Sequence, residues 1–470
     1  MLTRLGLRLR IFLFFCLVAV AGAALAGGAL YFGWSRAEGG LPTAPFVTAF
    51  ILFAFLNTGL ALVIWLLFDE NVAKPINQLS AELRVRAHAG VDTSVSTDAA
   101  RYLGDLAPAA KALTRTASAS LMDSAARVAH ETQKLRAESE RLTALLTEIP
   151  IATILLNPAQ EIVLYDGQAA DVISEVAPPR LKAPLRDYFD ATEVVDAMAR
   201  LTGDTTEVGL ALYDTTRSLR FDARLKRLGD DGHMICIDVE NRERTKLAAR
   251  PLVFDFDLMN AAETRGIQDT RLSDLCFVPF DTETTGLSIA DDAIVQLGAV
   301  RVLNGRIVEG EVMDTYVNPG RPIPPASTKI HKVTDADVAE APDIAQVGRA
   351  FHHFARDAVL VAHNAPFDIG LLRKFAPDMG VDWSHPVLDT VLLSSVAFGI
   401  NEQHSLDALC ERLSIRIPEN LRHTAHGDAR ATAEALVRLL PMLEGMGVGT
   451  FGQLVQETRK HGRLLQDLNA

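Results

Sequence analysis

Two long stretches without a charged side chain place the strongest constraint on this chain. Residues 11–34 and 45–68 are apolar almost throughout. As helices rising about 1.5 Å per residue, each would be about 36 Å long, enough to cross a bilayer. A cleaved signal peptide is the competing interpretation of the first stretch, but the stretch is too long and a second one follows closely. We therefore predict a two-helix membrane anchor over residues 1–68.

The flanks of these stretches predict their orientation. Basic residues precede the first stretch and follow the second: Arg4, Arg8, Arg10, Lys74, Arg84 and Arg86. By the positive-inside rule, both ends of the anchor lie in the cytoplasm, so we expect an inner-membrane protein with two spans and a cytoplasmic remainder. The cysteines are far apart and form no CxxC pair: Cys16, Cys236, Cys276 and Cys410. This pattern favours reduced thiols over a disulfide framework or a structural zinc site.

The composition limits what the rest of the chain can be. With 470 residues, the chain is long enough for about three folded units, and its 49 % hydrophobic content excludes wholesale disorder. The formal net charge is −13. A broadly basic surface for gripping nucleic acid is therefore absent, although a metal-dependent site could still bind nucleic acid through the charge of its cations.

Residues 69–148 have the pattern of a helical connection. Two amphipathic stretches around a polar loop over 69–117 resemble a HAMP linker, and a plain juxtamembrane linker is the alternative. Residues 118–148 are predicted to form one helix whose apolar residues recur every seven positions: Leu121, Val128, Leu135 and Leu142. This is half of a coiled-coil seam and predicts a parallel homodimer, or else a single amphipathic helix packed on its own chain.

From Pro150 the hydrophobic period changes from helical to strand-like. Residues 151–167 predict a β-hairpin, a helical stretch follows near 185–202, and three strand-like segments complete the region. This order over 149–243 resembles a PAS-type sensor domain of the α+β class, which could take a small ligand that the sequence does not identify. His233 is predicted to be a structural or solvent-facing histidine. Residues 244–270 are predicted to be a linker with a short docking segment.

The segment LCFVPFDTETTGL carries the first chemical signal. It is predicted to be a strand in which Asp281 and Glu283 point to the same side, because residues two apart share a face. Two carboxylates this close repel each other unless a cation lies between them. Hard oxygen ligands of this kind suit Mg²⁺ or Mn²⁺. Thr284, Thr285 and Gly286 are predicted to form a tight turn next to this pair.

Two further elements add carboxylates and a histidine. Asp368 lies near the start of a predicted helix that follows a strand through Val361, and Asp428 opens an Ala-rich helix. His423 precedes Asp428 by five residues, which on one helix would leave the two about 140° out of phase. We therefore place His423 on the loop before the helix. Four carboxylates with one histidine fit two-metal phosphodiester hydrolysis, in which the histidine takes a proton from the attacking water.

The motifs DTETTGL, IHKVTDADV, AHNAPFD, HSLDALCERL and HTAHGDA follow in this order. They resemble the DEDD-type 3′–5′ exonucleases, in the branch with a histidine in the third motif, which includes the epsilon proofreading subunit of bacterial DNA polymerase III. The resemblance implies a ribonuclease-H-like domain over 271–445, with a mixed sheet and flanking helices. It implies two divalent cations, Mg²⁺ or Mn²⁺, on metal ligands Asp281, Glu283, Asp368 and Asp428, with His423 as general base.

The same resemblance implies the substrate contacts: Thr284, Thr285, Gly286, Leu287, His331 and Asn364. Leu287 would be an apolar wedge against the 3′-terminal nucleotide. The H-x-A-x-x-D register selects His423 rather than His426 as the catalytic histidine. One departure from the epsilon pattern is Ala326, which stands where that subunit has an acidic residue.

The sequence therefore predicts an α/β exonuclease domain behind a PAS-like domain, a coiled-coil helix and two transmembrane helices. The expected reaction is hydrolysis from a free 3′ end to nucleoside 5′-monophosphates, with single-stranded DNA as the expected substrate. An RNA exonuclease and a membrane sensor that binds nucleotide without turnover are the alternatives, and a polymerase accessory subunit is a third. Residues 446–470 are predicted to be a short helical tail.

Overall fold

The computed structural model describes residues 7–36, 42–80, 151–201, 205–228, 232–239, 252–260 and 266–469. The chain divides into two compact units, residues 1–124 and 125–470. Most of the predicted HAMP-like linker and the whole predicted coiled coil lie outside the described residues. Those two predictions therefore remain predictions.

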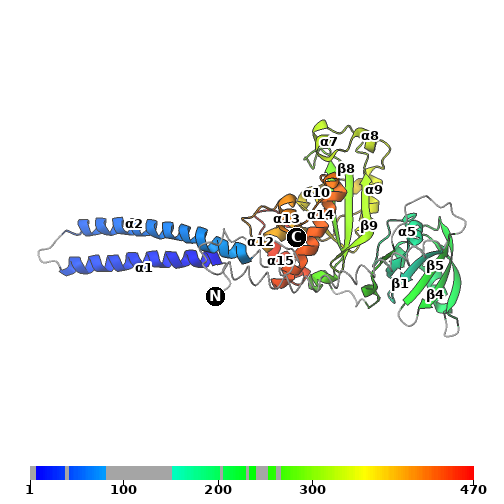
Figure 1. The fold of residues 1–470 in the computed structure, drawn as a ribbon, viewed down its shortest axis with the longest axis horizontal. Helices are drawn as coiled ribbons and strands as arrows, with labels where there is room; N and C mark the ends of the chain where they lie inside the picture. Colours follow the sequence, from blue (N-terminus) through cyan, green and yellow to red (C-terminus); the bar gives the residue numbers. More distant parts are fainter. Residues whose placement is uncertain are drawn as a thin grey trace. The chain divides into compact units, whose positions relative to one another are not determined.

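In the first unit, two helices run antiparallel side by side (Figure 1): α1 (Leu7–Arg36) and α2 (Ala44–Phe68). Asn57 donates a hydrogen bond to the carbonyl oxygen of Ala19 at 2.8 Å, and the Arg8 guanidinium binds the carboxylate of Asp69. A π-helical turn, η2 (Asp69–Ala73), continues α2 toward Ser80. By length and composition, both helices could cross a membrane, with a mean hydropathy of 2.4 each. The predicted helical pair is confirmed, and its insertion in a membrane stays a prediction.

The second unit begins with a six-stranded sheet in the order β3-β4-β5-β1-β2-β6, with antiparallel neighbours throughout. Its strands are β1 (Ile151–Leu156), β2 (Ile162–Tyr165), β3 (Glu207–Tyr213), β4 (Arg220–Leu228), β5 (Gly232–Asp238) and β6 (Val253–Phe254). It carries the helices α5 (Gly167–Ser174), η4 (Leu185–Asp187) and α6 (Ala191–Arg200). The predicted hairpin and three strands are confirmed. The predicted linker supplies the edge strand β6.

The local sequence explains these elements. In β4, exposed and buried residues alternate, as expected for a strand with one face on a core. Asp166 and Asp190 begin α5 and α6, where their carboxylates accept hydrogen bonds from the first free backbone N–H groups.

The second sheet has five strands in the order β11-β10-β7-β8-β9. Its strands are β7 (Phe277–Thr284), β8 (Ile294–Leu303), β9 (Arg306–Tyr316), β10 (Val359–Ala362) and β11 (Val387–Asp389). Strands β7, β10 and β11 are parallel, whereas β8 and β9 pair antiparallel, so the predicted mixed sheet is confirmed.

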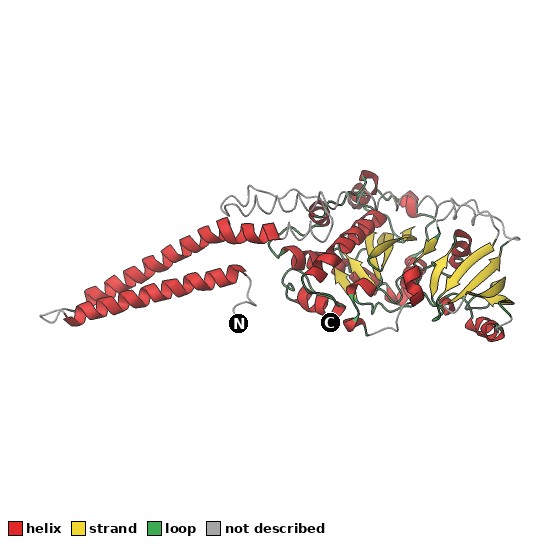
Figure 2. Ribbon diagram, turned by 60° about the horizontal axis from the view of Figure 1, so that its bottom comes forward, coloured by secondary structure: helices red, strands yellow, loops and turns green. Residues whose placement is uncertain are grey.

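Helices surround this sheet (Figure 2). They are α7 (Pro325–His331), α8 (Asp335–Val338), α9 (Ile344–Phe354), α10 (Ala365–Lys374), α11 (Ala376–Met379), α12 (Thr390–Phe398), α13 (Leu406–Arg412), α14 (Ala425–Gly445) and α15 (Phe451–Arg459). Short 3₁₀ turns are η5 (Phe256–Asn260), η6 (Ile267–Asp269), η7 (Leu272–Asp274) and η8 (Glu419–Leu421). Helix α14 packs on β7 and β8, and every residue of β8 is buried. The centre of the sheet therefore lies under α14.

Candidate active site

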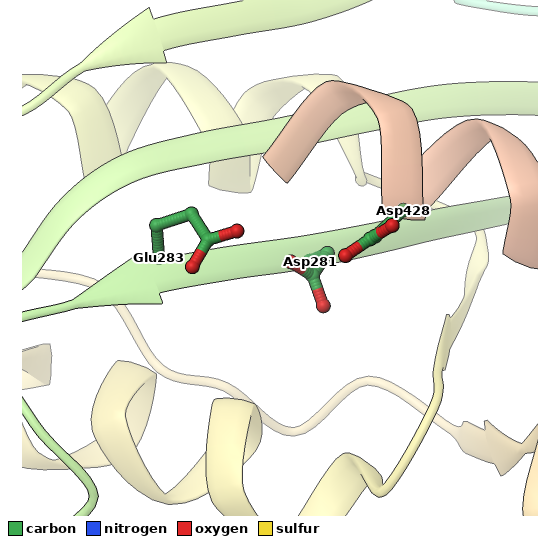
Figure 3. A group of neighbouring side chains, drawn as sticks. All are labelled: Asp281, Glu283 and Asp428. Carbon is green, nitrogen blue, oxygen red and sulfur yellow. The ribbon is translucent and has the colours of Figure 1, made fainter. Parts of the chain in front are cut away.

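Strand β7 presents two carboxylates to the N-terminal turn of α14. Asp281 and Glu283 lie two residues apart on the strand, and Asp428 is in the first turn of the helix (Figure 3). One carboxylate oxygen from each of the three residues lies within 4.8 Å of the others. Because Asp281 and Glu283 share one face of β7, the strand and the helix bring three of the four predicted metal ligands to one point.

The start of α14 is fixed by its own sequence. Thr424 is the N-cap residue, and its hydroxyl accepts a hydrogen bond from the backbone N–H of Gly427 at 3.1 Å. His423 precedes the cap with φ of 55°, in the left-handed region. Its side chain is exposed, as expected for the predicted loop position, and His426 is the second residue of the helix itself.

Burial and mutual repulsion raise the pKa values of the carboxyl groups. Burial, followed by the nearby Asp368, Glu283 and Asp428 carboxylates, raises the pKa of Asp281 well above its usual range. Burial, followed by the Asp428 and Asp368 carboxylates, raises the pKa of Glu283 to about 8. Burial also raises the pKa of Asp428, while the charge and main chain of His423 act in the opposite direction. The site therefore concentrates negative charge that its own surroundings do not neutralise.

The fourth predicted ligand, Asp368, is held by a different contact. Its Oδ1 accepts hydrogen bonds from the backbone N–H of Thr282 at 3.2 Å and from the Thr282 hydroxyl at 2.5 Å. Burial raises the pKa of Asp368 to about 7. Asp368 thus lies close enough to Asp281 to perturb its pKa, but its carboxylate is turned onto β7 beside the cluster.

A buried aspartate orients the helix that carries Asp368. Asp389 ends β11 and accepts hydrogen bonds from the backbone N–H groups of Ala365 at 2.6 Å and Val391 at 2.7 Å. It thereby caps the starts of α10 and α12. Sequence reasoning missed Asp389, although Asp-Thr after an apolar run is an N-cap signal that could have identified it.

The predicted turn after Glu283 is closely packed. The Thr285 hydroxyl donates a hydrogen bond to Asp292 at 2.8 Å, and a Cβ atom added to Gly286 would lie 2.5 Å from the same carboxylate. A side chain at position 286 would therefore displace the Asp292 carboxylate from its hydrogen bonds with Thr285 and Ser288. Leu287 is 90 % exposed at the end of this turn.

The remaining predicted substrate contacts lie on α7 and at the start of α10. His331 is buried, and its Nδ1 accepts the backbone N–H of Val333 at 3.1 Å. Burial lowers the pKa of His331, while a hydrogen bond with the main chain of Thr284 acts in the opposite direction. This contact brings His331 to the Thr284 turn. Asn364 is exposed in a left-handed conformation, with φ of 69°, and its side chain does not cap α10.

The donor set fits divalent cations. Clustered carboxylate oxygens are the ligands that Mg²⁺ and Mn²⁺ prefer, and the raised pKa values mark the carboxylates as lacking a positive partner. Asp281, Glu283 and Asp428 could hold such an ion in the arrangement seen. The acidic cluster is thus suited to metal-assisted chemistry on a phosphate group.

Comparisons with known proteins place this site in a family. The exonuclease family model RNase_T matches residues 278–436. The DNA polymerase III subunit epsilon-like protein of Rhodobacter capsulatus is 31 % identical over 100 % of both chains. The PolC-type DNA polymerase III of Caldanaerobacter subterraneus subsp. tengcongensis is 38 % identical over 38 % of this chain, which covers 12 % of that relative.

Among solved structures, exonuclease X in complex with 5′ overhanging duplex DNA is 30 % identical. The match covers 39 % of this chain and 99 % of that chain, with a TM-score of 0.32. The full-length similarity to the Rhodobacter protein, together with the exonuclease match over the acidic cluster, shows the family. This chain belongs to the DNA polymerase III subunit epsilon-like proteins and contains an exonuclease domain.

Proposed function

We propose that this protein is a membrane-anchored 3′–5′ exonuclease that hydrolyses nucleic acid to nucleoside 5′-monophosphates, with single-stranded DNA as its substrate. The observation that carries the proposal is the group of three carboxylates within 4.8 Å of one another, inside the residues that match the exonuclease family. Two of the relatives are named as DNA polymerase III proteins, which favours DNA over RNA.

Asp281, Glu283, Asp368 and Asp428 would hold two divalent cations, Mg²⁺ or Mn²⁺. When bound, these cations would offset the buried negative charge and stabilise the charge that develops on the phosphate oxygens. Thr282 holds Asp368 against β7, and Asp389 fixes the helix on which Asp368 lies. The ligands thus come from three elements: strand β7 and the first turns of helices α10 and α14.

His423 would take the proton from the water that attacks the terminal phosphodiester. Its side chain is exposed, lies before α14, and is near enough to Asp428 to perturb the pKa of that carboxyl group. Histidine is the side chain that most often serves as a general base. The left-handed backbone at His423 is a conformation that non-glycine residues rarely adopt, and such strain concentrates at functional sites.

The turn after Glu283 would hold the 3′-terminal nucleotide. Thr284, Thr285 and Gly286 would offer main-chain contacts, and the exposed Leu287 would pack under the terminal base. His331 and Asn364 would border the same nucleotide from α7 and from the start of α10.

The other regions would place this chemistry at the inner membrane. Helices α1 and α2 would span the bilayer with both ends in the cytoplasm. The sheet of β1–β6 would be a PAS-like domain that takes a small ligand, and residues 118–148 would pair two chains in a homodimer. The catalytic domain would then face the cytoplasm.

The test is degradation of 5′-labelled single-stranded DNA and RNA of one sequence by the full chain in detergent, with Mg²⁺, with Mn²⁺ or with a chelator. We expect a ladder that shortens from the 3′ end, faster on DNA, and only with the cations. His423→Ala should lower kcat by about 10²- to 10⁴-fold, the usual contribution of a general base. His426→Ala is the matched control and should stay near the wild type.

Each other outcome redirects the proposal. Faster RNA turnover would make the substrate RNA, and a 5′-mononucleotide released first from the labelled end would reverse the direction. An inactive wild type that still binds nucleotide would support the non-hydrolytic sensor. An equal loss in the two histidine variants would remove His423 from the role of base.

A further inference from the structure

The first turn of α14 approaches β8 more closely than a side chain would allow. A Cβ atom added to Gly298 would lie 2.2 Å from the backbone carbon of Ala425 and 2.2 Å from the backbone nitrogen of His426. Because Cβ atoms essentially never approach a backbone this closely, α14 can begin here only with glycine at position 298. The helix start is therefore seated directly on the strand.

The strand register puts this contact beside the acidic cluster. Gly298 on β8 lies opposite Asp281 on β7, and Gln296 lies opposite Glu283. On the other side, Gly298 lies opposite Asp314 of β9. Directly opposed residues of neighbouring strands point to the same face of a sheet. Gln296 thus shares a face with the two carboxylates of β7 and with the start of α14.

The side chain of Gln296 links that helix start to the sheet. Its Oε1 accepts a hydrogen bond from the backbone N–H of Ala425 at 3.3 Å, and its Nε2 donates to Oδ1 of Asp314 at 2.8 Å. The first N–H groups of a helix have no partner within the helix, so Gln296 satisfies one of them. One partner can only donate and the other can only accept, and this fixes the orientation of the Gln296 amide.

We infer that Gln296 is a positioning residue for the metal ligand Asp428 and the base His423, an inference that rests on the proposed function. Ala425 lies two residues after His423 and three before Asp428. Movement of the Ala425 N–H away from β8 would therefore move both groups relative to Asp281 and Glu283. Thr424 binds the first turn of α14 from the adjacent position in the sequence, whereas Gln296 binds it from strand β8 of the sheet.

The first test compares Gln296→Leu with the wild type as full chains in detergent, free of metal. Mn²⁺ is added alone and its affinity is measured by electron paramagnetic resonance. We expect about 10- to 100-fold weaker Mn²⁺ binding, the usual effect of losing a group that supports a metal ligand. Hydrogen exchange of peptides covering residues 421–430 should also become faster.

The matched control is Thr450→Ala, which removes the N-cap hydroxyl of α15. This variant loses a helix cap elsewhere in the same domain and should bind Mn²⁺ as the wild type does. A similar loss of Mn²⁺ affinity in Thr450→Ala would overturn the inference, because general destabilisation would then explain both results.

A second test exchanges donor and acceptor. In Gln296→Glu, the new carboxylate can still accept from Ala425 but faces the carboxylate of Asp314, so Mn²⁺ affinity should change. In Gln296→Glu with Asp314→Asn, the amide of residue 314 can donate to residue 296, and the net charge equals that of the wild type. We expect this double variant to recover the wild-type helix exchange and Mn²⁺ affinity to within a few-fold.

The outcomes separate this inference from the proposed function. A wild-type chain that neither binds Mn²⁺ nor degrades nucleic acid would end the proposed function. If the wild type does both, and Gln296→Leu keeps the wild-type Mn²⁺ affinity and the wild-type hydrogen exchange over residues 421–430, only the positioning role of Gln296 is overturned. If Gln296→Leu does not fold, the comparison of Gln296→Glu with the double variant still tests the inference. A double variant whose Mn²⁺ affinity is no closer to the wild type than that of Gln296→Glu would contradict it.

Discussion

Among the described residues of the second unit, a buried ion pair can be compared with the buried carboxylates of the active site, which lack a positive partner. Arg301 on β8 and Glu311 on β9 form an ion pair at 2.8 Å, with side chains 1 % and 0 % exposed. Arg301 also donates to the carbonyl oxygen of Phe354 at 2.9 Å, and Glu311 accepts from the Tyr165 hydroxyl at 3.0 Å. The active-site cluster instead gathers carboxylates whose pKa values are raised by burial and by one another.

The contrast distinguishes structural charge from functional charge. In a buried ion pair with hydrogen bonds, each charge is compensated by its partner. Removing one member leaves the other charge buried without compensation. A cluster of like charges is unfavourable unless a cation binds to it. Removing one charge should therefore destabilise the paired group and stabilise the unpaired one in the metal-free protein.

The largest expected effect belongs to the paired group. Arg301→Met leaves the Glu311 carboxylate buried without a cation and should lower the free energy of unfolding by about 3–5 kcal/mol. Adding Glu311→Gln removes the stranded charge and keeps an acceptor, so the double variant should recover most of the loss. Denaturant unfolding of the full chain in detergent measures both. If the single and double variants were equally stable, the pair would carry no such role.

The opposite sign is expected at the acidic cluster. Asp281→Asn keeps the shape of the side chain and removes one of the repelling charges. The midpoint of thermal unfolding of the metal-free protein should rise by about 2–4 °C, the shift that 1 kcal/mol produces in a domain of this size. Metal-dependent nuclease activity should fall at least about 100-fold, because bound cations supply several kcal/mol of transition-state stabilisation.

Asn at position 281 also tests the comparison itself. The matched control is Asp291→Asn, which removes a carboxylate outside the acidic cluster that accepts a hydrogen bond from the Ser288 hydroxyl. This variant should leave both activity and stability near the wild type. A lower thermal midpoint in Asp281→Asn would show that this carboxylate is structural, like Glu311.

A pH series tests the acidic cluster without mutation. The pKa of Glu283 is about 8 in the folded protein against an ordinary value of 4.5, and that of Asp368 is about 7 against 3.8. Since the folded state binds these protons more tightly than the unfolded state, the stability that these two groups contribute is present at low pH and is lost as the pH rises through about 8. The thermal midpoint of the metal-free protein should therefore fall between pH 7 and pH 8. In this range the buried His353, His363 and His385, whose pKa values burial lowers to about 4, are neutral in both states and do not oppose the fall.

Cations should remove that pH dependence. With saturating Mg²⁺ or Mn²⁺, the carboxylates gain a positive partner and the thermal midpoint at pH 8 should rise toward its value at pH 7. Asp281→Asn with the same additions is the control and should show a smaller fall and a smaller recovery. A midpoint that rises between pH 7 and pH 8 in the metal-free wild type would contradict the raised pKa values of Glu283 and Asp368.

Much of the site follows from local rules of sequence. The period of two on a strand places Asp281 and Glu283 on one face, and helical phase places His423 outside the helix that carries Asp428. Each of these inferences needs only a few neighbouring residues. The mixed sheet is instead expected from the resemblance to the exonuclease family, and the structure confirms it.

Other parts depend on contacts between distant segments. Gln296 is one polar residue in the apolar run IVQLGAV, and its partner Ala425 is 129 positions away. Arg301 lies where the register between β8 and β9 shifts, so strand alternation does not give its direction. The bond between Asp368 and Thr282 spans 86 positions and is likewise invisible in either motif alone. Tertiary packing decides all three.

The smallest effect on stability is expected at Leu287, which belongs to neither buried group. Its side chain is 90 % exposed, so Leu287→Ala should change the free energy of unfolding by no more than about 0.5 kcal/mol. If Leu287 packs under the terminal base, the KM for a DNA oligonucleotide should rise several-fold, because the lost contact is apolar area covered only by substrate. The comparison to make is with Ile330→Ala, another exposed apolar residue, on α7. Equal KM values in both variants would mean that Leu287 is an ordinary surface residue, and the proposed nucleotide-binding role of this turn would lose its apolar wedge.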